Sequence, residues 1–396
     1  MFIEGILSED NSVFKFLRGL DLDLYLSKPQ FNHVTSFLNH MTRETYNGKI
    51  VNVKHRHRTS LGRFLNDSQW DHDAVYNQLK SYSIDYIYNR AKLTNKPIYV
   101  SIDDTTCVKT KPSSQANHPI EGCSWHFSHV EKRQVYGHQF VAITLSCDGV
   151  TMPYQIIPYE KVKASKIELV QEILETLPTP PIKSYFLADS WYTCQTLLRL
   201  AKIKKFYYLG AVKTNRIIFP KTHRKKGIQL KEFSKELSLK DLDLVTVGDK
   251  QYYTYTYEGK VKSGHIVKII LSWPKKTVFN EKTLRCFISQ DTHLSAKKIL
   301  KHYTKRWLIE TFFRDSKQSF GLANYQIRTL KGIKRLLILI QMVYFFIYKK
   351  KVKHQSFGET LHVHQTKCYQ NVIQFVHNKT LDGMTLDLIF EELKIA

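Results

Sequence analysis

Four residues near the C-terminal end of the chain combine types and spacing that suit phosphodiester chemistry. In the segment YTKRWLIETFFRDSK, Arg306, Glu310 and Lys317 follow Tyr303 by three, seven and fourteen residues. On an α-helix, at roughly 100° per residue, the four positions project within about 60° of one another. The shared face offers a carboxylate that can hold a divalent metal, and a phenol, a guanidinium and an ammonium that can bind phosphate oxygens. The alternative is an ordinary solvated helix face whose charges have this spacing by chance.

Two further acidic residues follow apolar runs that predict strands. The run KPIYVSIDD leads to Asp104, and IKSYFLADS leads to Asp189. Asp103 directly precedes Asp104, and only one of the two can point into a shared site because strand side chains alternate between faces. Alternation alone does not choose between them.

The elements that must position these acids follow the order β-β-β-α-β-α-β between about residues 96 and 214. Residues 135–159 predict two strands joined at Asp148-Gly149, a hairpin signal. The order is that of the ribonuclease-H-like fold, so we expect an α/β protein. In that sheet the first and fourth strands are neighbours, which brings Asp104 and Asp189 together, and a later helix adds Glu310.

Three carboxylates in one pocket repel each other unless a cation neutralises them. With oxygen ligands alone the cation should be Mg²⁺, with Mn²⁺ as a substitute, rather than zinc. Two such ions about 3.5–4 Å apart would activate a water or a 3′-hydroxyl and stabilise the leaving oxygen in an in-line displacement.

The chain divides into five predicted regions around this core. A helical N-terminal domain is followed by the first part of the core, a mostly β insertion rich in Tyr, Thr, Val and Lys, the catalytic helix with the end of the core, and a helical tail. The predicted bounds are 1–95, 96–214, 215–292, 293–353 and 354–396.

The charge balance favours a polyanionic partner. Lys and Arg number 60 against 35 acids, a formal net charge of +25 over 396 residues, which indicates nucleic acid first and a membrane surface second. The longest apolar stretch, 336–348, is shorter than the ~20 residues that cross a bilayer, so no membrane association is expected. The segment MFIEGILSEDN lacks the basic region and long apolar stretch that are typical of a signal peptide, and six irregularly spaced cysteines suit a reducing compartment. We therefore expect a cytoplasmic protein.

A basic stretch in the N-terminal region, KHRHRTSLGRFL at 54–65, precedes a predicted helix. Its cations, among them Arg56 and Arg58, indicate that the N-terminal helical domain binds a DNA end. The competing interpretation is a surface loop with incidental charge.

A second metal hypothesis involves zinc. Cys123, His126 and His129 are each three residues apart, close to zinc-ligand spacing, and Cys107 would complete a tetrahedron. The competing interpretation treats 109–134 as a loop with polar and packing side chains.

Taken together, these features resemble the DDE transposases of bacterial insertion sequences, in the subgroup with the signature Y-x2-R-x3-E-x6-K. Tyr303, Arg306, Glu310 and Lys317 match the signature at every spacing, and Asp104-Thr105-Thr106 matches the Asp-Thr-Thr that follows the first strand of that family. The resemblance favours Asp104 over Asp103. After Asp189, the sequence Ser190-Trp191-Tyr192 keeps the family's aromatic residue but not the small residue before it.

The resemblance implies an activity and a set of roles. It implies a nucleoid-associated bacterial enzyme, acting as a homodimer, that cuts DNA at terminal inverted repeats and joins the ends to target DNA, often through a hairpin. Asp104, Asp189 and Glu310 would be catalytic metal ligands. Tyr303 and Arg306 would hold phosphates at the element's end, and Lys317 a phosphate near the cut.

The sequence allows two roles for Trp307 and two alternative functions for the chain. Trp307 is a candidate to stack on a displaced base, or else an ordinary core residue. The chain as a whole is alternatively a ribonuclease-H-like nuclease that performs no strand transfer, or an inactive transposase-derived protein that only binds DNA.

Overall fold

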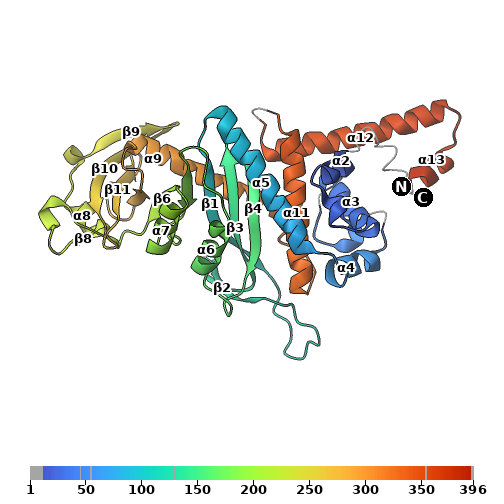
Figure 1. Cartoon of the computed structure of the whole chain (residues 1–396), viewed down its shortest axis with the longest axis horizontal. Coiled ribbons are helices and arrows are strands. Elements are labelled where there is room, and N and C mark those ends of the chain that lie inside the picture. The colour runs from blue at the N-terminus through green and yellow to red at the C-terminus, as the bar shows by residue number, and fades with distance from the viewer. Residues whose placement is uncertain (1–11, 45, 54–55, 129–130, 353–354, 394–396) are drawn as a thin grey trace.

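A mixed ten-stranded sheet runs from the middle of the molecule to its left end in Figure 1. The computed structural model describes residues 12–44, 46–53, 56–128, 131–352 and 355–393. In the described residues the strand order is β2-β3-β1-β5-β6-β12-β11-β10-β9, with β4 also paired to β3. The strands are β1 Tyr99–Val108, β2 Ser124–Ser128, β3 Arg133–Cys147, β4 Val150–Tyr159, β5 Tyr185–Ala188, β6 Tyr207–Val212, β9 Asp243–Val247, β10 Lys250–Lys260, β11 Ile266–Pro274 and β12 Arg285–Ser289.

The core of this sheet has the ribonuclease-H-like arrangement that the sequence predicts. β3 runs antiparallel to β1 and β4 antiparallel to β3, whereas β5 is parallel to β1 and β6 parallel to β5. The β3–β4 hairpin turns at Asp148 and Gly149, which both have positive φ (46° and 80°), as this kind of tight turn requires. The fold class is confirmed.

The β-rich insertion extends the central sheet. β12 pairs antiparallel with β6, and β11, β10 and β9 continue outward from it. A separate two-stranded sheet, β7 Ile217–Ile218 with β8 Ile228–Gln229, lies in the same region. Because the added strands hydrogen-bond to the core, the insertion shares the core's backbone framework.

Helices cover both faces of the core strands. α6 and α7 contact each other, and α7 contacts β6, while α9 contacts β6 and β12 and α10 contacts β1 and β3. α5 and α11 pack on β4. The helices are α2 Ser12–Arg18, α3 Lys28–Arg43, α4 Arg58–Asn66, α5 His72–Thr94, α6 Lys166–Glu175, α7 Gln195–Ile203, α8 Leu230–Lys235, α9 Ala296–Tyr303, α10 Trp307–Ser319, α11 Leu330–Lys350, α12 Phe357–Leu381 and α13 Leu386–Leu393.

The helix α11 joins the core to the N-terminal helices. It contacts β4 on one side and α3 and α4 on another. Arg335 on this helix is fully buried and donates to four backbone carbonyls, at 3.1 Å to Phe64, 2.9 Å to Leu65, 2.7 Å to Ser68 and 3.1 Å to Trp70. Within the described residues, no helix combines the length and apolar character that crossing a membrane requires.

The signature segment is two helices and not one. α9 ends at Tyr303, a 3₁₀ turn covers Thr304–Arg306, and α10 begins at Trp307. The tighter turn rotates Tyr303 relative to the residues that follow it. The projection expected for a continuous α-helix therefore holds for Arg306, Glu310 and Lys317 better than for Tyr303.

Candidate active site

The adjacent acids of β1 point to opposite faces of the sheet. Asp103 ion-pairs with Arg306 of the 3₁₀ turn, whereas Asp104 ion-pairs with Lys166 at the start of α6. This is the alternation expected of a strand. The structure thus places Asp103, and not Asp104, on the face that carries the signature residues.

A guanidinium connects two carboxylates on that face. Arg306 Nη1 lies 2.8 Å from Asp103 Oδ2, and its Nη2 donates to Glu310 Oε1. Arg306 and Glu310 are one helical turn apart, so both reach β1 from the same side. Only 14% of the Arg306 side chain and 18% of the Asp103 side chain is exposed, so their Coulombic attraction is screened less than in water, but both charges are partly desolvated.

Burial shifts the titration of Asp103. It raises the pKa of this carboxyl to about 7, because desolvation outweighs the opposing effect of Arg306, and the nearby charges of Asp189 and Asp104 raise it further. Displaced carboxyl pKa values are typical of functional sites.

Asp189 lies beside Asp103 at the end of the neighbouring strand. Ile102 is in register with Ala188 of the parallel strand β5, so Asp103 and Asp189 are the next residues along both strands. The Asp189 Oδ1 accepts hydrogen bonds from the backbone N–H groups of Trp191 at 2.8 Å and Tyr192 at 3.2 Å. These bonds fix the carboxylate at the start of the loop to α7.

Asp104 belongs to a different environment. Its Oδ2 accepts from Lys166 and, at 3.3 Å, from the side-chain amide of Gln139 on β3. Lys166 is the first residue of α6, where the helix dipole disfavours a cation. An ion pair with a carboxylate offsets this unfavourable interaction. A lysine at the start of a predicted helix was therefore the sequence signal that could have suggested an acidic partner for Lys166.

The other signature residues surround the Asp103 face. The Tyr303 ring packs 4.8 Å from that of Phe287, and the Arg306 guanidinium lies 5.6 Å from the Tyr303 ring centroid. Lys317 Nζ donates at 3.0 Å to the carbonyl of Thr106 on β1. Trp307 is 61% exposed, so it is not a core residue.

Arg56 and Arg58 lie apart from the carboxylates. Both are exposed, and Arg58 begins α4. The helix α11 separates α4 from β4, since it contacts both. Any DNA bound by these arginines must therefore extend across the molecule to reach the Asp103 face.

The proposed zinc ligands do not gather in the described residues. Cys123 Sγ lies 3.4 Å from His138 Nδ1, whereas His126 contacts the Ser124 hydroxyl at 2.9 Å. His129 lies outside the described residues. His138 also contacts the Glu121 carbonyl and the Tyr325 hydroxyl, each at 2.6 Å, which indicates a structural polar cluster.

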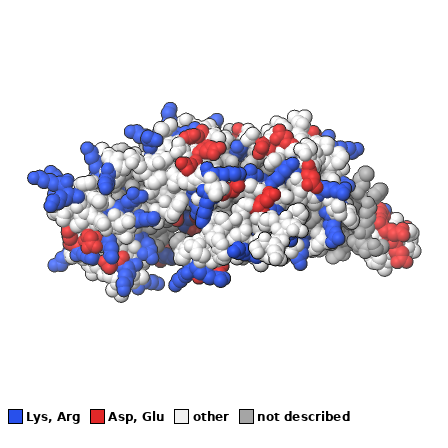
Figure 2. Space-filling model, turned by 90° about the horizontal axis from the view of Figure 1, so that it is seen from below, with Lys and Arg blue, Asp and Glu red and all other residues white. Residues whose placement is uncertain are grey.

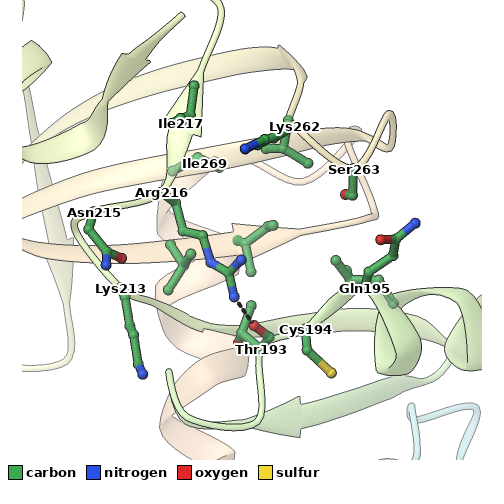
Figure 3. A pocket seen from close by; sticks show the side chains of 14 residues that line it. Thr193, Cys194, Gln195, Lys213, Asn215, Arg216, Ile217, Lys262, Ser263 and Ile269 are labelled. Atoms are coloured by element: carbon green, nitrogen blue, oxygen red, sulfur yellow. Dashed lines mark hydrogen bonds between the residues drawn. The ribbon is translucent and has the colours of Figure 1, made fainter.

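The loop after Asp189 borders a pocket of about 640 Å³ between the core and the insertion (Figure 3). Arg216 reaches into it and donates to the Thr193 carbonyl at 2.6 Å. Lys213 and Lys262 also line it. More widely, Lys and Arg side chains are spread over much of the face shown in Figure 2, as the net charge of +25 requires.

The donor set fits a hard divalent cation in kind, because Asp103, Asp189 and Glu310 offer only oxygen. In the parts of the chain that the structure describes, no three His, Cys, Asp or Glu side chains lie close enough together to share an ion. The Arg306 guanidinium supplies the positive charge between two of these carboxylates instead.

Comparison with known proteins identifies the class. The sequence model of the family described as "Transposase DDE domain" matches residues 95–346, more than half of the chain. The chain therefore belongs to the DDE transposase family.

A solved structure is similar over most of the chain. It is described as "Cryo-EM structure of piggyBac transposase synaptic complex with hairpin DNA", and it shares 12% identity with a TM-score of 0.43. The match covers 93% of this chain and 76% of the other. No curated protein matches the chain.

Proposed function

We propose that this protein cuts the ends of a bacterial insertion sequence and joins them to target DNA. The observation that carries the proposal is the partly buried network of Asp103, Arg306 and Glu310 beside Asp189, within a chain of the DDE transposase family. The spacing of Tyr303, Arg306, Glu310 and Lys317 supports membership of the subgroup with that signature.

The proposed catalytic and metal-binding residues are Asp103, Asp189 and Glu310. Asp103 replaces Asp104 in this set because only Asp103 shares a face with Glu310. Mg²⁺ ions, or Mn²⁺, held by these carboxylates would activate the attacking oxygen and stabilise the leaving one. Arg306, which pairs with Asp103 and Glu310 in this structure, would bind a phosphate with any N–H donors that these carboxylates do not occupy.

The remaining signature residues bind DNA in this proposal. Lys317, beside the β1 backbone, would bind a phosphate near the cut, and Tyr303 would hold a phosphate at the element's end together with Arg306. The exposed ring of Trp307 would stack on a base. Arg56 and Arg58 would hold the duplex of the terminal inverted repeat farther away, and a homodimer would hold two ends together.

The experiment uses the DNA that flanks the gene. Labelled fragments that carry its terminal inverted repeats are incubated with the protein, Mg²⁺ and a target plasmid, with Ca²⁺ and the Glu310→Gln variant as controls. We expect Mg²⁺-dependent cuts at the ends, followed by covalent joining to the plasmid. Cuts without joining would identify a nuclease, and binding without cuts a DNA-binding remnant; either result would refute the proposal.

A further inference from the structure

Lysine and aromatic side chains alternate along a row that begins beside Asp189 and ends at β2. β2 is the terminal strand of the sheet order, so one of its edges pairs with no strand among the described residues. We define the lysine–aromatic row by its six members, which are Trp191, Lys166, Tyr159, Lys161, Trp125 and Lys111.

The first half of the row is fixed by Lys166. Its Nζ lies 4.9 Å from the ring centroid of Trp191 and 5.6 Å from that of Tyr159, within cation–π range of both. The same ammonium ion-pairs with Asp104. The row therefore begins at the loop that Asp189 anchors, on the Asp104 face of β1.

The second half is fixed around Trp125. Lys161 Nζ donates to the Trp125 carbonyl, and Lys111 Nζ lies 5.9 Å from the Trp125 ring centroid. The Trp125 ring packs edge-on against Tyr136 at 5.7 Å. The buried ring of His126, 6.3 Å from that of Tyr159, connects the two halves.

The indoles of the row are presented to solvent. Trp191 is 45% exposed and Trp125 48% exposed, although tryptophan is among the most buried residues on average. Each indole is held by the contacts above, so its exposed surface stays at a defined place. Such a surface offers flat apolar area next to a positive charge.

The row keeps an excess of positive charge. Asp104 is neutralised by Lys166, and Glu160 by Lys163 at 2.8 Å. Lys161 and Lys111 form no ion pair with any residue that the structure describes. A lysine ammonium has three N–H donors, so Lys161 retains donors for an anion after binding the Trp125 carbonyl.

We propose that the lysine–aromatic row binds unpaired nucleotides of a DNA strand that leaves the active site. Lys161 and Lys111 bind phosphates, Lys166 holds the ring of Trp191 in place, and the exposed indoles stack on bases. The bases must be unpaired, because the faces of a base inside a duplex are covered by its neighbours. This inference rests on the proposed function, and it assigns the strand released beside Asp189 a path toward β2.

The test compares two DNA ligands of arbitrary sequence, since stacking tolerates any base. Fluorescence anisotropy, without divalent metal, measures the affinity of the full-length protein for a blunt duplex and for the same duplex with a single-stranded overhang. We expect tighter binding of the overhang. Trp125→Ala should lose about tenfold in overhang affinity, the equivalent of about 1.4 kcal/mol of stacking, with little change for the blunt duplex.

Matched variants separate stacking from folding. Trp125→Phe keeps an aromatic face and should keep most of the affinity. Tyr369→Ala removes an aromatic side chain of 59% exposure on α12, outside the row, and should change nothing. Cross-linking of 5-iododeoxyuridine in the overhang should label Trp125.

Two results would overturn the inference. One is an affinity of Trp125→Ala for the overhang duplex equal to that of the wild type, which is also the result expected if the row binds another protein and not DNA. The other is an equal loss for blunt and overhang duplexes. In both cases the protein would still cut DNA with Mg²⁺, and the proposed function would stand. If the proposed function alone is wrong, the protein does not cut the DNA ends but still prefers the overhang duplex.

Discussion

The two faces of β1 differ although their acids are adjacent in the chain. On one face Asp103 is bound by Arg306, which a second carboxylate, Glu310, shares. On the other face Asp104 has Lys166 and an amide, with no second acid bound to the same ammonium among the described residues. The metal site that we propose therefore lies on the Asp103 face, where two carboxylates share one cation.

The sharpest test of this comparison exchanges the two acids for amides separately. Asp103→Asn should lower DNA cutting at least about a thousandfold, because a metal ligand contributes several kcal/mol to the transition state. Asp104→Asn should stay within about tenfold of wild type. Cleavage rates with Mg²⁺ decide the matter, and the reverse order would assign the site to the Asp104 face.

Glu310→Gln tests the helix side of the same face. We expect a loss of cutting similar to that of Asp103→Asn, about a thousandfold, because the amide cannot replace a carboxylate as a metal ligand. End binding by gel shift should remain largely intact. Normal cutting would exclude Glu310 as a ligand and reduce its role to positioning Arg306.

Arg306→Lys tests whether the shared cation must be planar. An ammonium cannot bridge Asp103 and Glu310 with two fixed N–H donors, so we expect cutting to fall about 10- to 100-fold. The matched change on the other face is Lys166→Arg, which should have a smaller effect on the rate. Equal effects would mean that the two faces contribute alike.

The Asp104 face should show its own pH dependence through His126. Burial, with Lys161 and Lys166 nearby, lowers the pKa of this imidazole from 6.5 to about 4. The unfolded chain then binds more protons between these values, so stability falls as the pH drops from 6.5 toward 4. Denaturation at pH 7 and pH 5 should show about 2 kcal/mol more loss in wild type than in His126→Gln. Parallel losses would indicate that His126 is solvated.

Lys317→Ala should produce the smallest change. Removing one phosphate contact is expected to lower the slope of log affinity against log salt by about 1, and to slow end processing more than non-specific binding. The control is Lys367→Ala, which removes an exposed lysine on α12, outside the signature segment. An unchanged slope would mean that Lys317 only supports the Thr106 carbonyl.

The sequence predicts most of the core because its signals are local. Apolar runs and the Asp148-Gly149 turn predict the strands around Asp104 and Asp189, and the structure confirms them. Which of Asp103 and Asp104 faces Arg306 is not a local property of the sequence, since it depends on the side from which the 3₁₀ turn carrying Arg306 approaches β1. The strand β2 was expected to be loop, because its alternation of polar and aromatic residues covers only Ser124–Ser128.

The buried Arg335 has a consequence for where cuts can fall. Its four bonds to carbonyls of residues 64–70 fasten the helix α4, with Arg58, to a helix that packs on the central sheet. Breaking them would leave a buried charge and several carbonyls unpaired, at a cost of about 3–5 kcal/mol. If the N-terminal helices bind a terminal repeat, these contacts hold them at a fixed distance from the proposed catalytic residues. The number of base pairs between the bound repeat and the cut would then be constant.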